Sequence, residues 1–183
     1  MLHFYINQHL SIKEISLKDA DAIFKAIDTQ RLYLGKWLPF VEFTTEKSDT
    51  EDYIRSVKKL PENHPDKVFV IHEYGKFAGI AGYKDTDLQN QKTEIGYWLS
   101  EPYQGRGIMT DVVNKMLAYA FDEMKMNRVQ IKCAVGNTRS SNIPKRLGFS
   151  FEGIERAGEL LSGGVFADLE VYSLLKGEYN SGI

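Results

Sequence analysis

The sequence predicts a mixed α/β fold in a single domain. Segments with apolar residues at helical spacing occur between segments rich in β-branched and aromatic residues, which are typical of strands. The chain has 183 residues, the usual length of one domain. It contains no repeat, low-complexity tract or linker, so we expect one domain over residues 1–183.

The first third of the chain predicts one strand and two helices. Residues 10–15 alternate weakly between apolar and polar side chains, as in a short strand. Each helix is expected to begin at a capping box, in which two residues three positions apart bond each other's main-chain N–H groups. The two pairs are Ser16 with Asp19, opening a helix to about Ile27, and Ser48 with Glu51, opening a helix over residues 49–60.

The remainder of the chain predicts six strands and two helices. Tyr74-Gly75-Lys76 is typical of the tight turn of a hairpin, and Gly148 is typical of a residue that ends a helix. The expected strands are 68–73, 77–83, 93–99, 128–135, 149–156 and 165–175, and the expected helices are 108–124 and 140–147.

The composition excludes several classes of function. Twenty-three Lys and Arg against 25 Asp and Glu give a net charge of −2, so we expect no direct binding of nucleic acid. One Cys rules out a disulfide framework, and the four His lack the spacing of metal ligands, so we expect no metal. The start lacks the features of a signal peptide, and no apolar run is long enough for a membrane helix. These observations favour a cytoplasmic protein without a membrane partner.

The most informative stretch is a glycine-containing turn before the helix at 108–124. Two glycines allow main-chain N–H groups to converge, and the helix N-terminus and an arginine add positive charge. The turn therefore predicts an anion site suited to a pyrophosphate, although a plain strand-to-helix turn would also use glycines. It lacks the ending of a P-loop and the third small residue of a dinucleotide fingerprint. Its residues are Gln104, Gly105, Arg106, Gly107, Ile108, Met109 and Thr110.

Four segments, in order and spacing, resemble the GNAT superfamily of N-acetyltransferases. Gln104 and Gly107 are in register with the acetyl-CoA signature Gln/Arg-x-x-Gly-x-Gly/Ala, and the preceding Glu94-Ile95-Gly96-Tyr97-Trp98-Leu99 is similar to the central strand. Asn137-Thr138-Arg139-Ser140, followed by Leu147-Gly148-Phe149, resembles the second signature. Arg31-Leu32-Tyr33-Leu34 and Lys36-Trp37-Leu38-Pro39-Phe40 resemble the ribosomal-protein N-terminal (RimJ/RimL-like) branch.

The resemblance implies a mostly antiparallel, twisted sheet of about six to seven strands, splayed in the middle and flanked by about four helices. It implies that acetyl-CoA lies between strands 93–99 and 128–135, bonded by main-chain groups of Tyr97, Trp98 and Leu99 and touched by Asn137. A main-chain N–H near Leu99 would polarise the thioester. Met109 departs from the signature, so we expect its side chain to point away from the ligand.

Two residues are candidate catalytic groups. Glu94 is the candidate base, directly or through a water, and its alternative role is a solvated residue or ion-pair partner. The family's usual tyrosine acid is replaced by Pro144. Ser140 is therefore the candidate acid, and its alternative role is a helix N-cap. Asn137 could also cap this helix, although the resemblance places its amide against acetyl-CoA. Cys133 alternates with apolar residues and is expected in the core.

The acceptor is expected to be an α-amine. An α-amine titrates near 7.7–8.0 and a lysine near 10.4, so a site with one candidate carboxylate suits the α-amine. Tyr33, Trp37 and Phe40 are candidates for an acceptor groove, or for core packing. The expected function is acetyl transfer to a Ser or Ala N-terminus of a protein, such as a ribosomal protein. The alternatives are a free small amine as acceptor, or a non-catalytic acyl-CoA-binding module. Analogy with relatives also suggests a homodimer.

Overall fold

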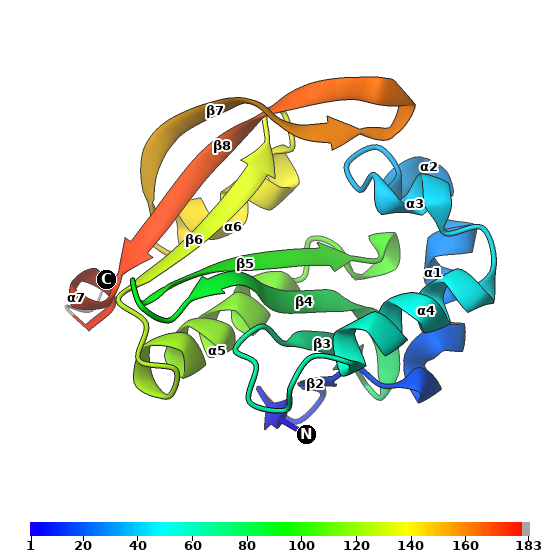
Figure 1. Ribbon diagram of the computed structural model, residues 1–183, viewed down its shortest axis with the longest axis horizontal. Helices are drawn as coiled ribbons and strands as arrows, with labels where there is room; N and C mark the ends of the chain where they lie inside the picture. The colour runs from blue at the N-terminus through cyan, green and yellow to red at the C-terminus, as the bar shows by residue number, and fades with distance from the viewer. Residues whose placement is uncertain (181–183) are drawn as a thin grey trace.

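One eight-stranded sheet runs through the computed structural model, which describes residues 1–180 (Figure 1). The strand order is β1-β2-β3-β4-β5-β6-β8-β7, and every neighbouring pair is antiparallel except β5 and β6. The strands are β1 (His3–Tyr5), β2 (Leu10–Glu14), β3 (Val68–Glu73), β4 (Lys76–Asp87), β5 (Lys92–Leu99), β6 (Arg128–Ala134), β7 (Ser150–Leu161) and β8 (Val165–Leu175).

The parallel pair divides the sheet. β5 and β6 pair only where Lys92–Glu94 lie beside Arg128–Gln130, and beyond Glu94 the two strands diverge (Figure 1). The splayed, mostly antiparallel sheet implied by the resemblance is therefore confirmed. The divergence leaves one edge of β5 without a neighbouring strand over its last residues, and this edge positions the candidate site.

Helices cover both faces of the sheet. One core cluster packs β2 to β6 against α5, and a second packs α1 and α4 against the opposite face. Phe69 and Ile71 belong to the first cluster and Val70 to the second, which is the alternation expected of a strand buried on both faces. The helices are α1 (Ala20–Thr29), α2 (Arg31–Leu34), α3 (Phe40–Phe43), α4 (Lys47–Lys58), α5 (Ile108–Asp122), α6 (Thr138–Arg146) and α7 (Lys176–Asn180).

The predicted strands and the four longer helices are all present, with differences at their ends. The capping box of Ser16 and Asp19 forms, but it precedes a short 3₁₀ turn rather than α1 directly. The second box consists of Glu46 and Asp49, not Ser48 and Glu51, because the Asp49 carboxylate accepts the N–H of Glu46 at 2.9 Å. α4 therefore begins earlier than predicted.

The sequence pattern did not predict the short helices and the short first strand. β1 has three residues, and α2, α3 and α7 have four or five, so none shows a full period of apolar residues. β4 and β7 each reach twelve residues, because the polar end of β4 and residues 159–161 of β7 pair with a neighbouring strand. Within residues 1–180, no helix combines the length and the apolar character needed to cross a membrane.

Candidate active site

The free edge of β5 offers main-chain groups to a ligand. The N–H of Ser100 donates to Ala78 of β4, and successive residues of a strand point their N–H and C=O groups to opposite edges. The main-chain groups of Tyr97 and Leu99 therefore face the gap beside β6. The Leu99 carbonyl already accepts the side-chain amide of Gln104 at 3.1 Å. These groups can hydrogen-bond an extended chain with amide groups as another strand would.

Trp98 departs from the expectation that its main-chain groups, like those of Tyr97 and Leu99, would bond acetyl-CoA. Its main chain faces β4, where its carbonyl oxygen would lie 2.3 Å from a Cβ built on Gly79. Its main-chain groups are thus turned away from the gap, and only Tyr97 and Leu99 can serve a ligand there in this way. The strand has no bulge between Glu94 and Leu99, because the irregularity falls between Lys84 and Asp87.

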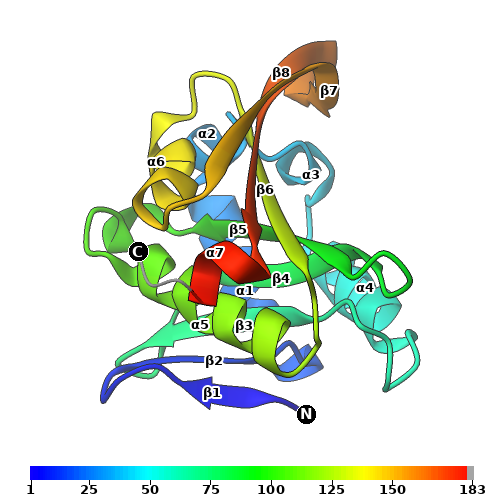
Figure 2. The same cartoon turned by 90° about the vertical axis from the view of Figure 1, so that its left-hand side faces the viewer.

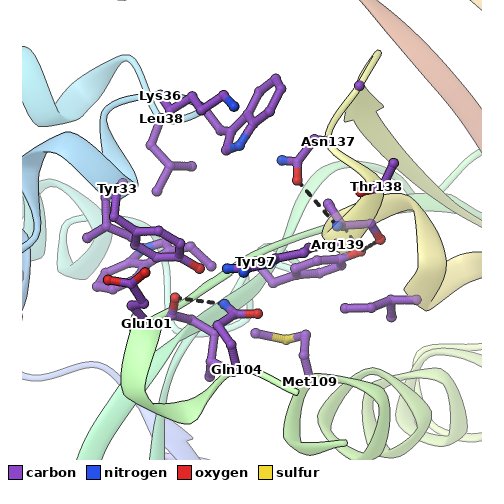
Figure 3. Close-up of a pocket in the computed structure, with 17 residues that line it drawn as sticks. Tyr33, Lys36, Leu38, Tyr97, Glu101, Gln104, Met109, Asn137, Thr138 and Arg139 are labelled. Atoms are coloured by element: carbon purple, nitrogen blue, oxygen red, sulfur yellow. Dashed lines mark hydrogen bonds between the residues drawn. The ribbon is translucent and has the colours of Figure 1, made fainter. Parts of the chain in front are cut away.

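A cavity of about 460 Å³, here called the splay cavity, opens between β5 and α6 (Figure 3). It brings together residues from α2, β5, α5 and α6 that are far apart in the sequence. The predicted site residues that line it are Tyr33, Trp37, Tyr97, Trp98, Leu99, Gln104, Met109, Asn137 and Ser140. Met109 is 5% exposed and belongs to the core, yet it borders this cavity rather than pointing away from it.

The glycine turn has the predicted backbone. Gly105 and Gly107 have φ angles of +73° and +76°, and Gly107 directly precedes α5. No described atom lies within 4 Å of a Cβ built on either glycine, so the conformation rather than close contact requires glycine here. The first N–H groups of α5 lack partners within the helix and form an anion-binding end.

The side chains of this turn are engaged elsewhere. The Arg106 guanidinium bonds the Glu73 carboxylate at 2.7 Å, and the Glu73 side chain is only 5% exposed. Ile108 is buried in the core, and the Thr110 hydroxyl accepts a hydrogen bond from Arg146. These residues, together with Gly105 and Gly107, do not line the splay cavity.

Two cationic residues of the splay cavity were not predicted. Lys36 and Arg139 both line it, and Figure 3 shows Arg139 reaching in from α6. Burial raises the pKa of the Tyr33 hydroxyl, and the neighbouring Arg139 guanidinium opposes that rise. Arg139 lies inside the Asn137–Ser140 segment, so position in that signature was the signal that could have identified it.

A cluster of three proton donors lies at the start of α6. The Tyr97 hydroxyl donates to the Ser140 carbonyl at 3.0 Å, and the Ser140 hydroxyl lies 3.4 Å from Tyr97 Oη and 3.2 Å from Cys133 Sγ. Burial raises the pKa of Cys133 to about 11 and that of Tyr97 well above its usual value. Cys133 and Tyr97 therefore stay protonated at neutral pH and can act as hydrogen-bond donors.

Asn137, not Ser140, caps α6. The Asn137 side chain accepts the N–H of Ser140 at 3.3 Å, so the capping role considered for Ser140 is wrong. Cys133 is 3% exposed and lies in the core, as predicted.

Glu94 lies in a second cavity of about 340 Å³, here called the charged cavity. The carboxylate is buried, pairs with Lys84 Nζ at 2.7 Å and accepts the Gln130 amide at 2.8 Å. Asp85, Lys132 and Glu159 also line this cavity. It shares Trp37, Leu38, Tyr97, Asn137 and Ser140 with the splay cavity, so the two cavities are adjacent.

Phe40 lies apart from the other two predicted acceptor residues. Trp37 lines both the splay and the charged cavity, and Tyr33 lines the splay cavity. Phe40 is 39% exposed and lines a third cavity, under α1 and α4.

Comparisons with known proteins agree with this geometry. Residues 9–150 match the model of the acetyltransferase (GNAT) domain family. The chain is 35% identical to the "Putative ribosomal N-acetyltransferase YdaF" of Bacillus subtilis (strain 168), and the match covers 95% of each chain. It is 24% identical to the ribosomal-protein-serine acetyltransferase of Escherichia coli (strain K12), covering 92% of this chain and 93% of that one.

A solved structure shows acetyl-CoA bound to a similar protein. The microcin C7 self-immunity acetyltransferase MccE, in complex with acetyl-CoA and AMP, superposes with a TM-score of 0.87 at 29% identity, covering 93% of this chain and 94% of that one. The family match spans well over half of the chain and coincides with the splayed strands and the glycine turn. The chain belongs to the GNAT family of N-acetyltransferases.

Proposed function

We propose that this acetyltransferase modifies the N-terminal α-amine of a protein whose first residue is Ser or Ala, such as a ribosomal protein, in the cytoplasm. The observation that carries the proposal is the contact between the splay cavity and the charged cavity along Tyr97. The splay cavity suits acetyl-CoA, and the charged cavity suits an amine. Both substrates can therefore be bound together, and the amine can attack the acetyl group directly.

The residues of the splay cavity fit acetyl-CoA. Main-chain groups of Tyr97 and the Leu99 carbonyl suit the amides of the pantetheine arm, and the N-terminus of α5, whose glycine turn lies outside the lining of the cavity, suits the pyrophosphate. Arg139 and Lys36 supply positive charge, and the Asn137 amide group borders the arm. Bound there, acetyl-CoA supplies the activated acetyl group.

Glu94 is proposed to receive the proton of the amine, directly or through one water. Its carboxylate is already paired with Lys84 and bonded by the Gln130 amide, and carboxylates as a class are weak bases. A weak base suffices for an α-amine, since roughly a third of such groups are neutral at pH 7.5. This is the reason to prefer an α-amine over a lysine side chain.

The main chain and the hydroxyl cluster serve the remaining steps. The Leu99 N–H polarises the acetyl carbonyl while the amine nitrogen bonds to its carbon. The bond from that carbon to sulfur then breaks, and the thiolate takes a proton from Ser140, which Tyr97 supports through its hydrogen bonds. Ser140 regains a proton from solvent, and Glu94 releases the amine proton to solvent. The products are the N-acetylated acceptor and free CoA.

The names of two relatives support the acceptor class, since one is called a ribosomal-protein-serine acetyltransferase and the other a ribosomal N-acetyltransferase. Mass spectrometry of ribosomal-protein N-termini, with and without this chain, tests the acceptor. Acetylation that depends on the chain and occurs on Ser or Ala supports the proposal. Unchanged N-termini, together with rapid acetylation of spermidine in vitro, would instead favour a free small amine.

Substitution of Glu94 tests the proposed base. Glu94→Gln keeps the size and the bond from Gln130 and should lower kcat about 100-fold, within the range typical of acid–base groups. CoA affinity should be unchanged, because Glu94 does not line the splay cavity. A variant that keeps full kcat would show that Glu94 is an ion-pair partner only.

Ser140→Ala tests the proposed acid and should slow turnover by about tenfold or more while leaving the Asn137 cap intact. Equal losses of activity and thermal stability would assign Ser140 a structural role instead.

A further inference from the structure

A chain of side-chain hydrogen bonds crosses the sheet where β5 and β6 part. Glu94 and Gln130 are partners in the last paired position of these two strands. Paired residues of neighbouring strands project to the same face of a sheet, so their side chains can meet. The Gln130 amide donates to Glu94 Oε2 at 2.8 Å, and its Oε1 accepts a hydrogen bond from Arg128 at 3.4 Å. Gln130 therefore links the candidate base to an arginine two residues away on β6.

Arg128 is itself held from the far side. Its guanidinium forms two hydrogen bonds to the Glu152 carboxylate, and Glu152 also accepts the Ser173 hydroxyl at 2.8 Å. Bidentate pairs of this kind fix the geometry of both groups. Together with the pair of Glu94 and Lys84, the bonds run across five neighbouring strands, from β4 to β7 (Figure 1). Arg128 is therefore a fixed donor, anchored on strands outside the candidate site.

The two partners of Gln130 determine which way its amide points. A guanidinium only donates hydrogen bonds, and a carboxylate only accepts them. The amide oxygen must therefore face Arg128 and the amide nitrogen must face Glu94, as the structure has them. The reversed amide would set oxygen against carboxylate and nitrogen against guanidinium, and would lose both bonds. Gln130 thus presents Glu94 with a donor of fixed direction.

The two carboxylate oxygens of Glu94 have different partners. Oε2 is bonded by Gln130, which does not line the charged cavity, and Oε1 pairs with Lys84, which does. The terminal torsion of a glutamate has a broad energy minimum, so one oxygen must be held for the other to keep its direction. The Lys84 side chain is 56% exposed and can move aside for an amine, whereas Gln130 lies behind the base. Oε1 is therefore the oxygen that the acceptor can reach.

We propose that Gln130 is a positioning residue for acetyl transfer: it holds Glu94 so that Oε1 faces the charged cavity, and Arg128 fixes the direction of its amide. The inference rests on the proposed function, in which Glu94 receives the proton of the amine. That proton adds to Oε1, the amine nitrogen keeps the electron pair that bonds the acetyl carbon, and the Gln130 amide keeps both its protons. Gln130 lines neither the splay cavity nor the charged cavity, so it acts through Glu94 alone.

Gln130→Met tests the inference, because methionine has nearly the same length but cannot donate a hydrogen bond. The kcat should fall about tenfold, as expected when a reacting group loses its orientation. The KM for acetyl-CoA should change by less than about twofold, because neither Gln130 nor Glu94 lines the splay cavity. Gln89→Met makes the same substitution in an exposed turn outside the three cavities and should change neither constant. Thermal denaturation checks that each variant is folded.

A double-mutant cycle with Glu94→Gln distinguishes positioning from a structural role. If Gln130 acts through Glu94, its loss has no effect once the base is gone. Gln130→Met should then change the kcat of Glu94→Gln by less than about twofold. If Gln130 only supports the fold, the two losses multiply, and the double variant should fall about tenfold below Glu94→Gln.

The cycle is measured with a peptide that begins Ser-Ala and with spermidine, by release of CoA thiol, and is read on the acceptor that is acetylated. Inert peptides would overturn the proposed acceptor, and the spermidine cycle would then decide the inference. Its result therefore does not depend on the class of the amine.

The outcomes separate the inference from the proposed function. Full kcat in Gln130→Met, together with a large loss in Glu94→Gln, would overturn the inference and leave Glu94 as the base. Losses that multiply would also overturn it and would assign Gln130 to the fold. Full kcat in Glu94→Gln would overturn the proposed base, and the inference with it. A loss in Gln130→Met that disappears in the Glu94→Gln background supports both.

Discussion

Arg106 lies in the turn expected to bind pyrophosphate, but its guanidinium is bound to Glu73, which is 33 residues away in the sequence. The Glu73 side chain is 5% exposed and that of Arg106 is 46% exposed. Removing one partner of a fully buried pair costs about 3–5 kcal/mol, whereas an exposed pair contributes about 0.2–1 kcal/mol. Water can replace the half-exposed arginine, so Arg106→Ala should cost about 1–2 kcal/mol, between these limits.

The expected loss is measurable as a lower Tm. For a chain of this size 1 kcal/mol corresponds to about 2–4 °C, so Tm should fall by about 2–8 °C. Glu73→Gln removes the buried charge, and Arg106→Ala in that background should lower Tm by less than it does alone. Thermal denaturation of the four proteins completes a double-mutant cycle.

CoA affinity, measured by calorimetry, distinguishes the two arginines near the proposed phosphate site. Arg139 lines the splay cavity, so Arg139→Gln should weaken binding by about tenfold or more, the value of a charged hydrogen bond. Arg106→Ala should weaken it less. An unchanged Tm, together with a larger loss of CoA affinity than in Arg139→Gln, would refute this reasoning and show that Arg106 serves the ligand rather than Glu73.

Three further predictions concern titration and backbone. Burial raises the pKa of Cys133 to about 11, so alkylation by iodoacetamide at pH 7.5 should be at least about tenfold slower than for free cysteine, and should accelerate only as the pH approaches 11. Arg128 lowers the pKa of Glu152 to about 2 from its usual 4.5; the resulting stability is complete above pH 4.5 and is lost as the pH falls towards 2. Glu152→Gln should therefore lose less stability than the wild type in acid unfolding between pH 5 and 2, and equal losses would contradict the assignment. Gly107→Ala forces a side chain to φ +76° and should cost about 1–2 kcal/mol in chemical denaturation, although the space around it is open.

Local patterns along the chain were enough to predict much of the fold. The apolar stripe of α5, with Val113, Met116, Leu117 and Phe121 on one face, is buried as its helical spacing predicts. The strands at the centre of the sheet were equally clear, because β-branched and aromatic residues fill them. Short elements such as β1 were missed, because three residues contain too few side chains for a period to be visible.

Residues of the candidate site could be predicted only where they belong to a recognisable local signature in the sequence. Gln104, Gly107 and Asn137 were identified because a glycine turn and a helix start have recognisable spacing. Arg139 lay within the same segment but was not singled out, since an arginine near a helix start has many roles. The hydroxyl of Tyr97 was missed because its partners, Ser140 and Cys133, come from other elements.

By itself, the sequence determined the fold class, the main helices and strands, the glycine turn and the family resemblance, since these depend on residues close together in the chain. Only the tertiary structure decided that Arg106 pairs with Glu73, that Glu94 pairs with Lys84, and that three cavities meet at Tyr97. The physical reason is that ion pairs and cavities depend on distances between elements. Those distances are set by how the sheet splays and how the helices pack on it, and no local pattern contains them.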